Sequence, residues 1–309
     1  MVTVKPKTIL AFDLDGTITA RSHFEISPNG LGELLNNLSD MGHYVIPVTG
    51  KPAAYVEKIF LVNNLKDRGI IAENAGVYRK PESQKIEVYG PSLDELFALR
   101  EKLGVGMDKV NVTNIFIDGN SYELVIDPDD VSILTIFTDP NYVSHRWNFK
   151  HSIDVNTLIE KIQNIIFNNK WDNNLTILPP FPDGAIQVIR KNPDTGKSID
   201  KFFISCVIDV MYPDSKNIPI AMFGDGHNDI PAMTLENIIP ITFANADEDV
   251  IKFVRVKRGY TSKHNAPDGL GVVDGLIWLA KNSFFGDDSE NVKSIILKSF
   301  PEILNNQKL

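Results

Sequence analysis

The feature that most constrains this chain is a short apolar run, Thr8–Phe12, that passes directly into acidic residues. Continuous rather than alternating hydrophobicity over five residues predicts a strand buried on both faces of a parallel sheet. Leucines then recur at helical spacing over 31–38, and a second apolar run covers 44–48. A helical pattern at about 52–65 and a third short apolar run at 69–72 follow. Strand, helix, strand, helix, strand predicts a doubly wound α/β fold.

The pattern changes after Gly76, where β-rich runs gather with two helical patterns between them, and the α/β alternation resumes after Lys197. We therefore expect a Rossmann-like parallel-sheet core from residues 1–80 and 190–309, interrupted by an inserted α+β domain over 81–189. The expected strands of the insertion lie at 86–89, 114–117, 122–126, 132–137 and 185–189, and its helices at 93–103 and 155–167.

Three local expectations concern the core. Pro47 lies within the second apolar run, which is unfavourable in a central strand because proline cannot donate a ladder hydrogen bond. The ranges 202–210 and 290–303 are each expected to form one helix. The single cysteine, Cys206, falls in the first of them and is expected to pack in the core.

Composition narrows the class of protein. A chain of 309 residues with 43% hydrophobic and 23% charged residues has the size of roughly two domains and the balance of a soluble globular protein. One cysteine allows no disulfide within the chain, and no apolar run approaches the roughly 20 residues that span a bilayer. We therefore expect a cytoplasmic protein. The net charge of −9 gives no reason to expect a nucleic-acid or membrane partner.

The strongest motif is Asp13-Leu14-Asp15-Gly16-Thr17, which follows the first expected strand. Two acidic side chains two residues apart on extended chain point to the same side, and this is costly unless a cation or a proton lies between them. One carboxylate can then act as a nucleophile while its neighbour transfers protons. The structural alternative is an acidic turn closed by Gly16. An EF-hand loop is excluded, because Thr17 and Ile18 stand where an acidic residue and a glycine are required.

A second acidic motif, Gly224-Asp225-Gly226-His227-Asn228-Asp229, follows another apolar run, 219–223. If a helix starts here, Asp225 and Asp229 lie on one face of it, because they are four residues apart. Carboxylate oxygens are the hard ligands that Mg²⁺ selects. A plain strand-to-helix turn with an Asp or Asn cap is the alternative, and the first acidic motif weakens it.

Two weaker motifs offer groups to an anion. Thr49 and Gly50 end the second apolar run just before a helix, where a hydroxyl and unpaired backbone N–H groups can bind an anion, although Thr49 could equally be a plain helix cap. The segment 194–198 contains Gly-Lys-Ser, but Lys191 stands where a P-loop requires glycine, so a P-loop is excluded. A lysine at a helix start can still serve as a point charge for phosphate.

In this order, Asp-x-Asp-Gly-Thr, Thr-Gly, Lys and Gly-Asp-x-x-Asn-Asp resemble the motifs of the haloacid dehalogenase superfamily. The likeness covers about residues 8–76 and 189–279, and the insertion resembles the large cap of the Cof-type subgroup, which includes sucrose-phosphate phosphatases. The resemblance implies a phosphatase that hydrolyses a small phosphorylated metabolite, such as a sugar phosphate or a phosphoglycerate-type ester. It also implies Mg²⁺, an aspartyl-phosphate intermediate, a cap that sets substrate specificity, and a monomer or homodimer.

The resemblance further implies a role for each motif residue. Asp13 is the nucleophile and Asp15 the general acid and base. Mg²⁺ is held by the Asp13 carboxylate, the Asp15 backbone carbonyl and Asp225, with Asp229 in support. The phosphoryl oxygens are bound by Thr49, Gly50, Lys197 and Asn228.

The lysine is the one motif at which the chain departs from this family, because Thr195-Gly196 stands where Lys-Gly is expected. Lys191 lies farther upstream, before a Pro-Asp turn, and stays open as the alternative. Lys201 is expected to lie a full turn into the helix, with its side chain along the helix surface. Lys197 falls at the expected helix start, from which a flexible ammonium could reach a phosphate near Asp13, and is therefore predicted to be the phosphate-binding lysine.

Two other classes of function remain open: a phosphotransferase or sugar phosphomutase on the same fold, and a non-catalytic binding protein. The carboxylate at Asp15 favours hydrolysis, because ion-pumping relatives carry threonine at this position. A basic and aromatic cluster in the insertion either grips a substrate or forms a solvated surface. It comprises His145, Arg146, Trp147, Lys150 and His151.

Overall fold

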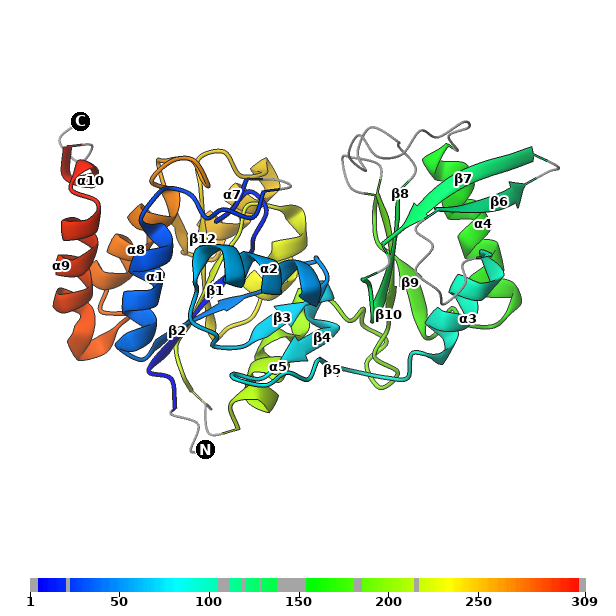
Figure 1. Cartoon of the computed structure of the whole chain (residues 1–309), viewed down its shortest axis with the longest axis horizontal. Helices are drawn as coiled ribbons and strands as arrows, with labels where there is room; N and C mark the ends of the chain where they lie inside the picture. The colour runs from blue at the N-terminus through cyan, green and yellow to red at the C-terminus, as the bar shows by residue number, and fades with distance from the viewer. Residues whose placement is uncertain are drawn as a thin grey trace. The chain divides into compact units, whose positions relative to one another are not determined.

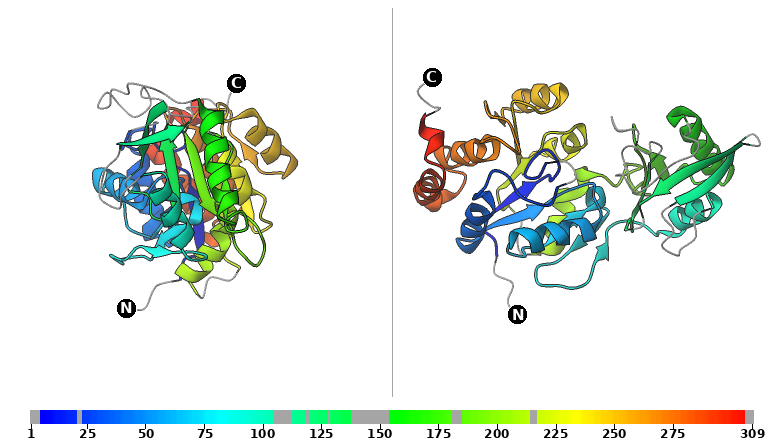
Figure 2. Two further views of the ribbon diagram at one scale, coloured as in Figure 1. Left: turned by 90° about the vertical axis from the view of Figure 1, so that its right-hand side faces the viewer. Right: turned by 45° about the horizontal axis from the view of Figure 1, so that its top comes forward.

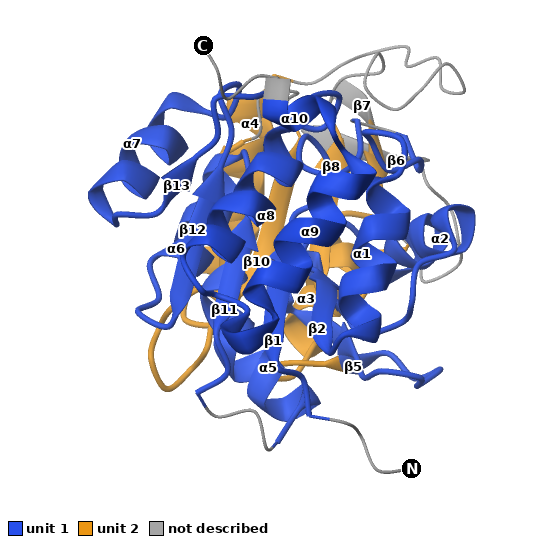
Figure 3. Ribbon diagram, turned by 90° about the vertical axis from the view of Figure 1, so that its left-hand side faces the viewer, with its two compact units in different colours: residues 1–87, 201–309 blue, residues 88–200 orange. Residues whose placement is uncertain are grey.

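The structure is a computed structural model that describes residues 5–20, 23–104, 112–117, 120–127, 129–137, 154–180, 185–213 and 217–305. Its two compact units consist of residues 1–87 with 201–309, and of residues 88–200 (Figure 3). The second unit begins and ends later in the chain than the predicted insertion, 81–189, so that Lys191 and Lys197 belong to it. The basic and aromatic cluster at 145–151 lies outside the described residues.

A sheet of five parallel strands in the order β13-β12-β11-β1-β2 is the centre of the first unit (Figure 3). The chain leaves β1 for β2 on one side and later returns to place β11 on the other side. This reversal makes a topological switch point at β1, as in other doubly wound sheets, and confirms the predicted Rossmann-like core. The strands are β1 (Thr8–Phe12), β2 (His43–Pro47), β11 (Ile220–Phe223), β12 (Ile238–Thr242) and β13 (Tyr260–Thr261).

Helices α1, α8 and α9 lie on one side of this sheet (Figures 1 and 3). The leucine repeat predicted α1 correctly, and Leu31, Leu34, Leu35 and Leu38 are all buried. Gly42 follows the helix end with φ of 92°, a left-handed conformation that glycine adopts without steric cost. The helices of this unit are α1 (Leu31–Asp40), α2 (Ala53–Asn63), α5 (Ile204–Met211), α6 (Ile230–Met233), α7 (Glu248–Val256), α8 (Gly271–Lys281), α9 (Ser289–Ser299) and α10 (Glu302–Asn305).

Pro47 is accommodated because it is the last residue of β2, which ends the five-stranded order. Beyond it, Val48 makes an isolated parallel bridge to Ile71 of β3. A small sheet follows, made of β3 (Ile70–Ala72), β4 (Val77–Arg79) and β5 (Glu87–Val88).

Two expected helices differ in the structure. The segment predicted as 202–210 begins with a 3₁₀ turn, η3 (Lys201–Phe203), and continues as α5. The terminal helix predicted at 290–303 is divided into α9 and α10, with Pro301 between them, because proline clashes with the preceding turn of a helix. Cys206 is exposed and not in the core, since α5 buries Ile204, Val207, Ile208 and Met211 along its other face.

The second unit contains an antiparallel sheet in the order β6-β7-β8-β10-β9. Helices α3 and α4 lie on one face of it (Figure 2), and the core between them is formed by leucine, isoleucine and valine side chains, Leu158 and Ile186 among them. The α+β prediction is confirmed, although β9 was missed and the strand expected at 86–89 is β5 of the small sheet with β3 and β4, not a strand of this one. The elements are α3 (Asp94–Lys102), β6 (Val112–Ile117), β7 (Asn120–Ile126), β8 (Ile133–Phe137), α4 (Val155–Asn168), β9 (Leu175–Ile177) and β10 (Ile186–Arg190).

Across the described ranges, none of the helices combines the length and the apolar character that crossing a membrane requires.

Candidate active site

The site is built at the carboxyl end of β1, where the chain turns sharply after Asp13. The Asp13 side chain is buried, and its backbone N–H donates to the carbonyl of Phe223 on β11, at 2.9 Å. Gly16 has φ of 86°, and a Cβ at this position would lie 2.2 Å from Asp225 Oδ2. Glycine is therefore required here twice, for the backbone conformation and for the close approach of a carboxylate.

The second acidic motif lies at the end of β11, the strand next to β1. Asp225 precedes the short 3₁₀ helix η4 (His227–Asp229), and its Oδ1 accepts a hydrogen bond from Thr17 Oγ1 at 3.1 Å. Asp229 is fully buried, and its Oδ2 accepts from the Gly226 N–H at 3.1 Å. The two carboxylates do not share a helix face as predicted, because the helix begins after Asp225, yet both reach the same cluster.

Lys201 joins the two acidic motifs. Its ammonium donates to Asp13 Oδ1 and to Asp229 Oδ1, both at 2.6 Å, and the side chain is fully buried. Lys201 is the first residue of η3, so the expectation that it lies one turn inside the helix is wrong.

Lys197 does not start this helix. Residues 193–195 form a turn, and an antiparallel bridge pairs Lys191 with Ser198, which leaves Lys197 exposed in the second unit. Pro193, Asp194 and Gly196 are residues that favour turns, so the turn precedes the helix and moves its start to Lys201.

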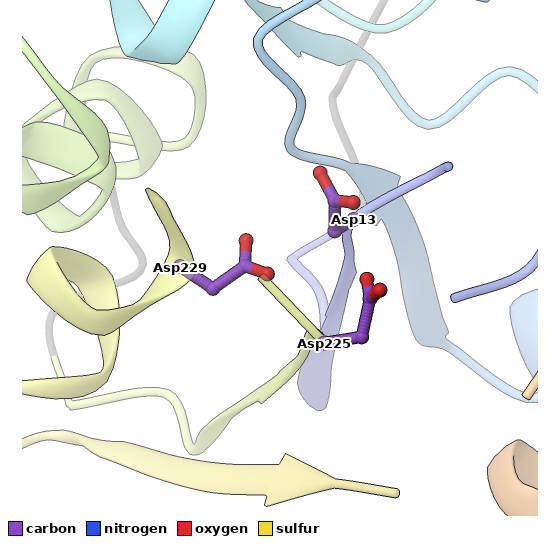
Figure 4. Close-up of side chains that lie close together, drawn as sticks. All are labelled: Asp13, Asp225 and Asp229. Carbon is purple, nitrogen blue, oxygen red and sulfur yellow. The ribbon is translucent and has the colours of Figure 1, made fainter. Parts of the chain in front are cut away.

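Charge is unbalanced in the cluster. One carboxylate oxygen from each of Asp13, Asp225 and Asp229 lies within 4.8 Å of the others, and Figure 4 shows the three side chains converging. Three carboxylates face one ammonium, which leaves an excess of two negative charges when all are ionised.

The pKa values follow from this arrangement. Burial raises the pKa of Asp13 well above its ordinary value, and Asp229 and Asp225 add to this effect against the opposing charge of Lys201. Burial alone would lower the pKa of Lys201, but Asp13 and Asp229 outweigh it and raise the pKa above its ordinary value. Lys201 therefore stays charged, and the ionised form of Asp13 calls for additional positive charge.

The cluster fits a divalent cation. Among the described residues, Asp13, Asp225 and Asp229 could each supply one ligand atom to a single ion. Carboxylate oxygens are hard ligands, and a divalent ion would neutralise the two excess charges that Lys201 leaves.

The other predicted residues lie at neighbouring strand ends. Thr49 is buried after β2, and its Oγ1 accepts from the Lys51 N–H at 3.2 Å in a turn before α2, whose N-cap is Pro52, so Thr49 is not a plain helix cap. Gly50 lies close to the Asn74 side chain. A Cβ at position 50 would be only 3.1 Å from Asn74 Oδ1. Asn228 is half-buried in η4.

Asp15 has two contacts that the sequence did not indicate. Its Oδ2 lies 3.1 Å from Lys51 Nζ, and its Oδ1 accepts from the Tyr55 hydroxyl at 3.3 Å. Lys51 was visible in the sequence as the residue after Thr49-Gly50, and Tyr55 falls in the helical pattern expected at about 52–65.

A family model of haloacid dehalogenase-like hydrolases matches residues 10–273. The matched range includes both acidic motifs, Thr49 and Lys201. No curated protein sequence matches the chain.

Solved structures share the fold over nearly the whole chain. A haloacid dehalogenase-like hydrolase from Bacteroides thetaiotaomicron is 17% identical with a TM-score of 0.56, and the match covers 93% of this chain and 99% of that one. A Thermoplasma acidophilum protein is 16% identical with a TM-score of 0.55, over 90% and 97%. The sucrose-phosphatase from Synechocystis, in complex with sucrose and phosphate, is 13% identical with a TM-score of 0.53, over 90% and 98%.

Proposed function

We propose that this chain, which belongs to the haloacid dehalogenase-like hydrolases, is a phosphatase that hydrolyses small phosphorylated metabolites through an aspartyl-phosphate. The observation that carries the proposal is the buried contact of Lys201 with Asp13 and Asp229 at the switch point of the parallel sheet. In open α/β sheets ligands bind at this position, beyond the carboxyl ends of the strands. The position of the Asp13 carboxylate beside the fixed charge of Lys201 supports a role for it as the nucleophile.

In the proposed reaction the Asp13 carboxylate attacks phosphorus, and the bond between phosphorus and the ester oxygen breaks as the acyl phosphate forms. Asp15 gives its proton to the leaving oxygen, so an alcohol departs. Asp15 then takes a proton from water as the water attacks phosphorus, which releases inorganic phosphate and restores Asp13. Phosphoryl transfer of this kind depends mainly on positioning and on neutralising charge.

Mg²⁺ is the proposed cofactor, held by the carboxylates of Asp13 and Asp225 and by the backbone carbonyl of Asp15. When bound, it supplies positive charge for the phosphoryl oxygens and lets the carboxylates remain ionised around an anion. Asp229 would not bind the ion directly in this proposal. It would hold the neighbouring groups in place, since its Oδ1 accepts a hydrogen bond from Lys201 and its Oδ2 accepts one from the Gly226 N–H.

Phosphoryl oxygens are bound in this proposal by Lys201, in place of Lys197. The Thr49 hydroxyl, the Gly50 N–H and the Asn228 side chain complete the set. Thr49 and Asn228 follow β2 and β11, the two strands that pair with β1, so both belong to the sheet edge at which Asp13 lies.

The substrate class proposed is a sugar phosphate or a phosphoglycerate-type ester. The test is a screen of phosphate release in Mg²⁺ across sugar phosphates, phosphoglycerates and glycosyl phosphoglycerates, with Asp13→Asn as the matched control. We expect release from at least one class with the wild type and none above background with the variant. Little phosphate release together with a need for a bisphosphate activator would instead identify a phosphomutase.

We further propose that the second unit, residues 88–200, determines which esters are accepted. The acidic cluster and Lys201 belong to the first unit and recognise only a phosphoryl group. Joining residue 87 to residue 201 by a short linker should leave hydrolysis of p-nitrophenyl phosphate and remove discrimination among natural esters. If the shortened chain, checked for folding by circular dichroism, keeps the parent's order of preference, the proposal is wrong.

A further inference from the structure

The two oxygens of the Asp15 carboxylate are contacted by two different donors from one segment. Lys51 Nζ lies 3.1 Å from Oδ2, and the Tyr55 hydroxyl lies 3.3 Å from Oδ1. Tyr55 lies in the first turn of α2, and Lys51 lies two residues before that helix begins. A carboxylate with one donor can still rotate about its bonds, whereas separate donors at both oxygens fix the plane of the group.

The two donors are themselves held in place. Lys51 Nζ lies 5.4 Å from the centre of the Tyr55 ring, within the range of a cation–π contact. The Tyr55 ring packs against Phe24 at 5.0 Å, and Lys58 Nζ lies 3.8 Å from the centre of the Phe24 ring. These contacts restrict both side chains before any substrate arrives.

Tyr55 has a second acceptor, the carbonyl of His23 at 3.2 Å. A phenol has one proton, so this carbonyl and Asp15 compete for it. Lys51 has three N–H protons and a full charge, and is therefore the stronger of the two donors to Asp15.

We infer that Lys51 and Tyr55 are positioning residues, which hold the Asp15 carboxylate in the orientation from which it gives its proton to the leaving oxygen. The inference rests on the proposed function and extends it to two residues that the motif assignments leave out. Lys51 then acts through Asp15 and not as a ligand of the substrate phosphate.

The test compares kcat/KM for p-nitrophenyl phosphate and phenyl phosphate in Mg²⁺. This constant covers the steps up to phosphoryl transfer to Asp13. Phenol is the poorer leaving group and depends more on proton donation, so misplacing Asp15 should slow its ester more. We expect Lys51→Met to lower kcat/KM about tenfold or more for phenyl phosphate and about threefold or less for the nitrophenyl ester. Tyr55→Phe should act in the same direction by a smaller factor, and Lys51→Arg should restore the wild-type ratio.

Three controls bound the effect. Asp15→Asn removes the proton donor itself. Its ratio of kcat/KM for phenyl phosphate to kcat/KM for p-nitrophenyl phosphate is therefore the lowest that misplacing Asp15 can produce. Lys66→Met removes a positive charge that pairs with a different carboxylate, Asp40, and Tyr260→Phe removes a hydroxyl that donates to Asp274 at 2.8 Å. Both should keep the wild-type ratio.

Equal losses for both esters in Lys51→Met and Tyr55→Phe would overturn the inference and assign Lys51 to the substrate phosphate. A ratio lowered as much by Lys66→Met would also overturn it, since net charge alone would then explain the effect. If the wild type hydrolyses neither ester, the proposed function itself fails and the inference fails with it. That outcome is distinct, because it appears before any variant is made.

Discussion

The two ends of β1 both carry buried ionisable groups, and they differ in their balance of charge. At the amino end, the ring of His43 is fully buried, with Nδ1 at 3.0 Å from Thr8 Oγ1 and Nε2 at 3.4 Å from Asp288 Oδ2. Lys7 pairs with the same carboxylate at 2.6 Å. At the carboxyl end, three carboxylates converge on one buried ammonium.

The comparison separates burial from function. Burial lowers the pKa of His43 in spite of the nearby carboxylate, so the ring is neutral at pH 7, and Asp288 is balanced by Lys7. At the amino end the one carboxylate therefore has a lysine partner. At the carboxyl end three carboxylates lie together beside the ammonium of Lys201, and an added cation or a proton would lower the repulsion among them. Several buried groups of like charge, more than a single buried one, mark the candidate active site.

The strongest test of this contrast is to replace one ionisable group at each end by an uncharged side chain of similar shape. Asp13→Asn should lower kcat about 10⁴-fold or more, because it removes the nucleophile while keeping the shape of the side chain. His43→Gln should leave kcat within about twofold, since it lies at the opposite end of the strand and stays uncharged. Steady-state phosphate release measures both, and a comparable loss in the two variants would show that burial at either end affects catalysis.

A second pair of variants compares Lys201 with Lys197. Lys201→Met should lower kcat/KM about 10²–10³-fold, because a fixed charge beside the nucleophile is lost. It should also destabilise the metal-free protein by about 3–5 kcal/mol, since Asp13 and Asp229 lose their buried partner. Lys197→Met, in an exposed turn, should change neither quantity. Phosphate release measures kcat/KM, and urea unfolding measures stability. A larger loss of kcat/KM in Lys197→Met than in Lys201→Met would contradict the assignment of Lys201.

Metal binding should stabilise only the carboxyl end. At saturating Mg²⁺ we expect the melting temperature of the wild type to rise by about 5 °C, because the ion binds the folded state alone. Asp225→Asn should lose most of this rise, whereas His43→Gln should keep it. Thermal unfolding with Mg²⁺ or with a chelator is the measurement. A rise that persists in Asp225→Asn would place the ion elsewhere.

The smallest expected effect is the pH dependence of the amino end. The folded-state pKa of His43 lies below its unfolded value of about 6.5, so the unfolded chain binds more protons as the pH falls through that value. The contribution of His43 to the free energy of unfolding is thus fully present above about pH 7 and declines below about pH 6.5. Asp288 stays ionised there, because the hydrogen bond from Lys7 holds its pKa below the ordinary value.

Between pH 7.5 and pH 5.5 the wild type should lose about 1–3 °C more in melting temperature than His43→Gln. Parallel curves for the two proteins would show that folding does not lower the pKa of His43, and the contrast between the two ends of β1 would then weaken.

Much of this site was readable from the sequence because its signals are local. The run Thr8–Phe12 and the run at 219–223 each predicted a buried strand, and the acidic motif after each predicted where its side chains would emerge. The motif order resembled the haloacid dehalogenase superfamily, and the family model over residues 10–273 confirms that resemblance. Strand ends and turn residues are decided within a few positions of the chain, so no distant contact was needed.

Tertiary structure alone decided which groups meet. Asp13 and Asp225 adjoin because β11 pairs with β1, a pairing of strands separated by the whole inserted unit. Lys201 contacts Asp13, which lies 188 residues away in the sequence. The helix begins at Lys201 and not at Lys197, because residues 193–195 form a turn before it. A lysine next to Phe202 and Phe203 gave a weak sign of burial, but the partner that keeps it charged there is far away in the chain. The charge balance of a buried site depends on such long-range pairs, and propensity and periodicity do not encode them.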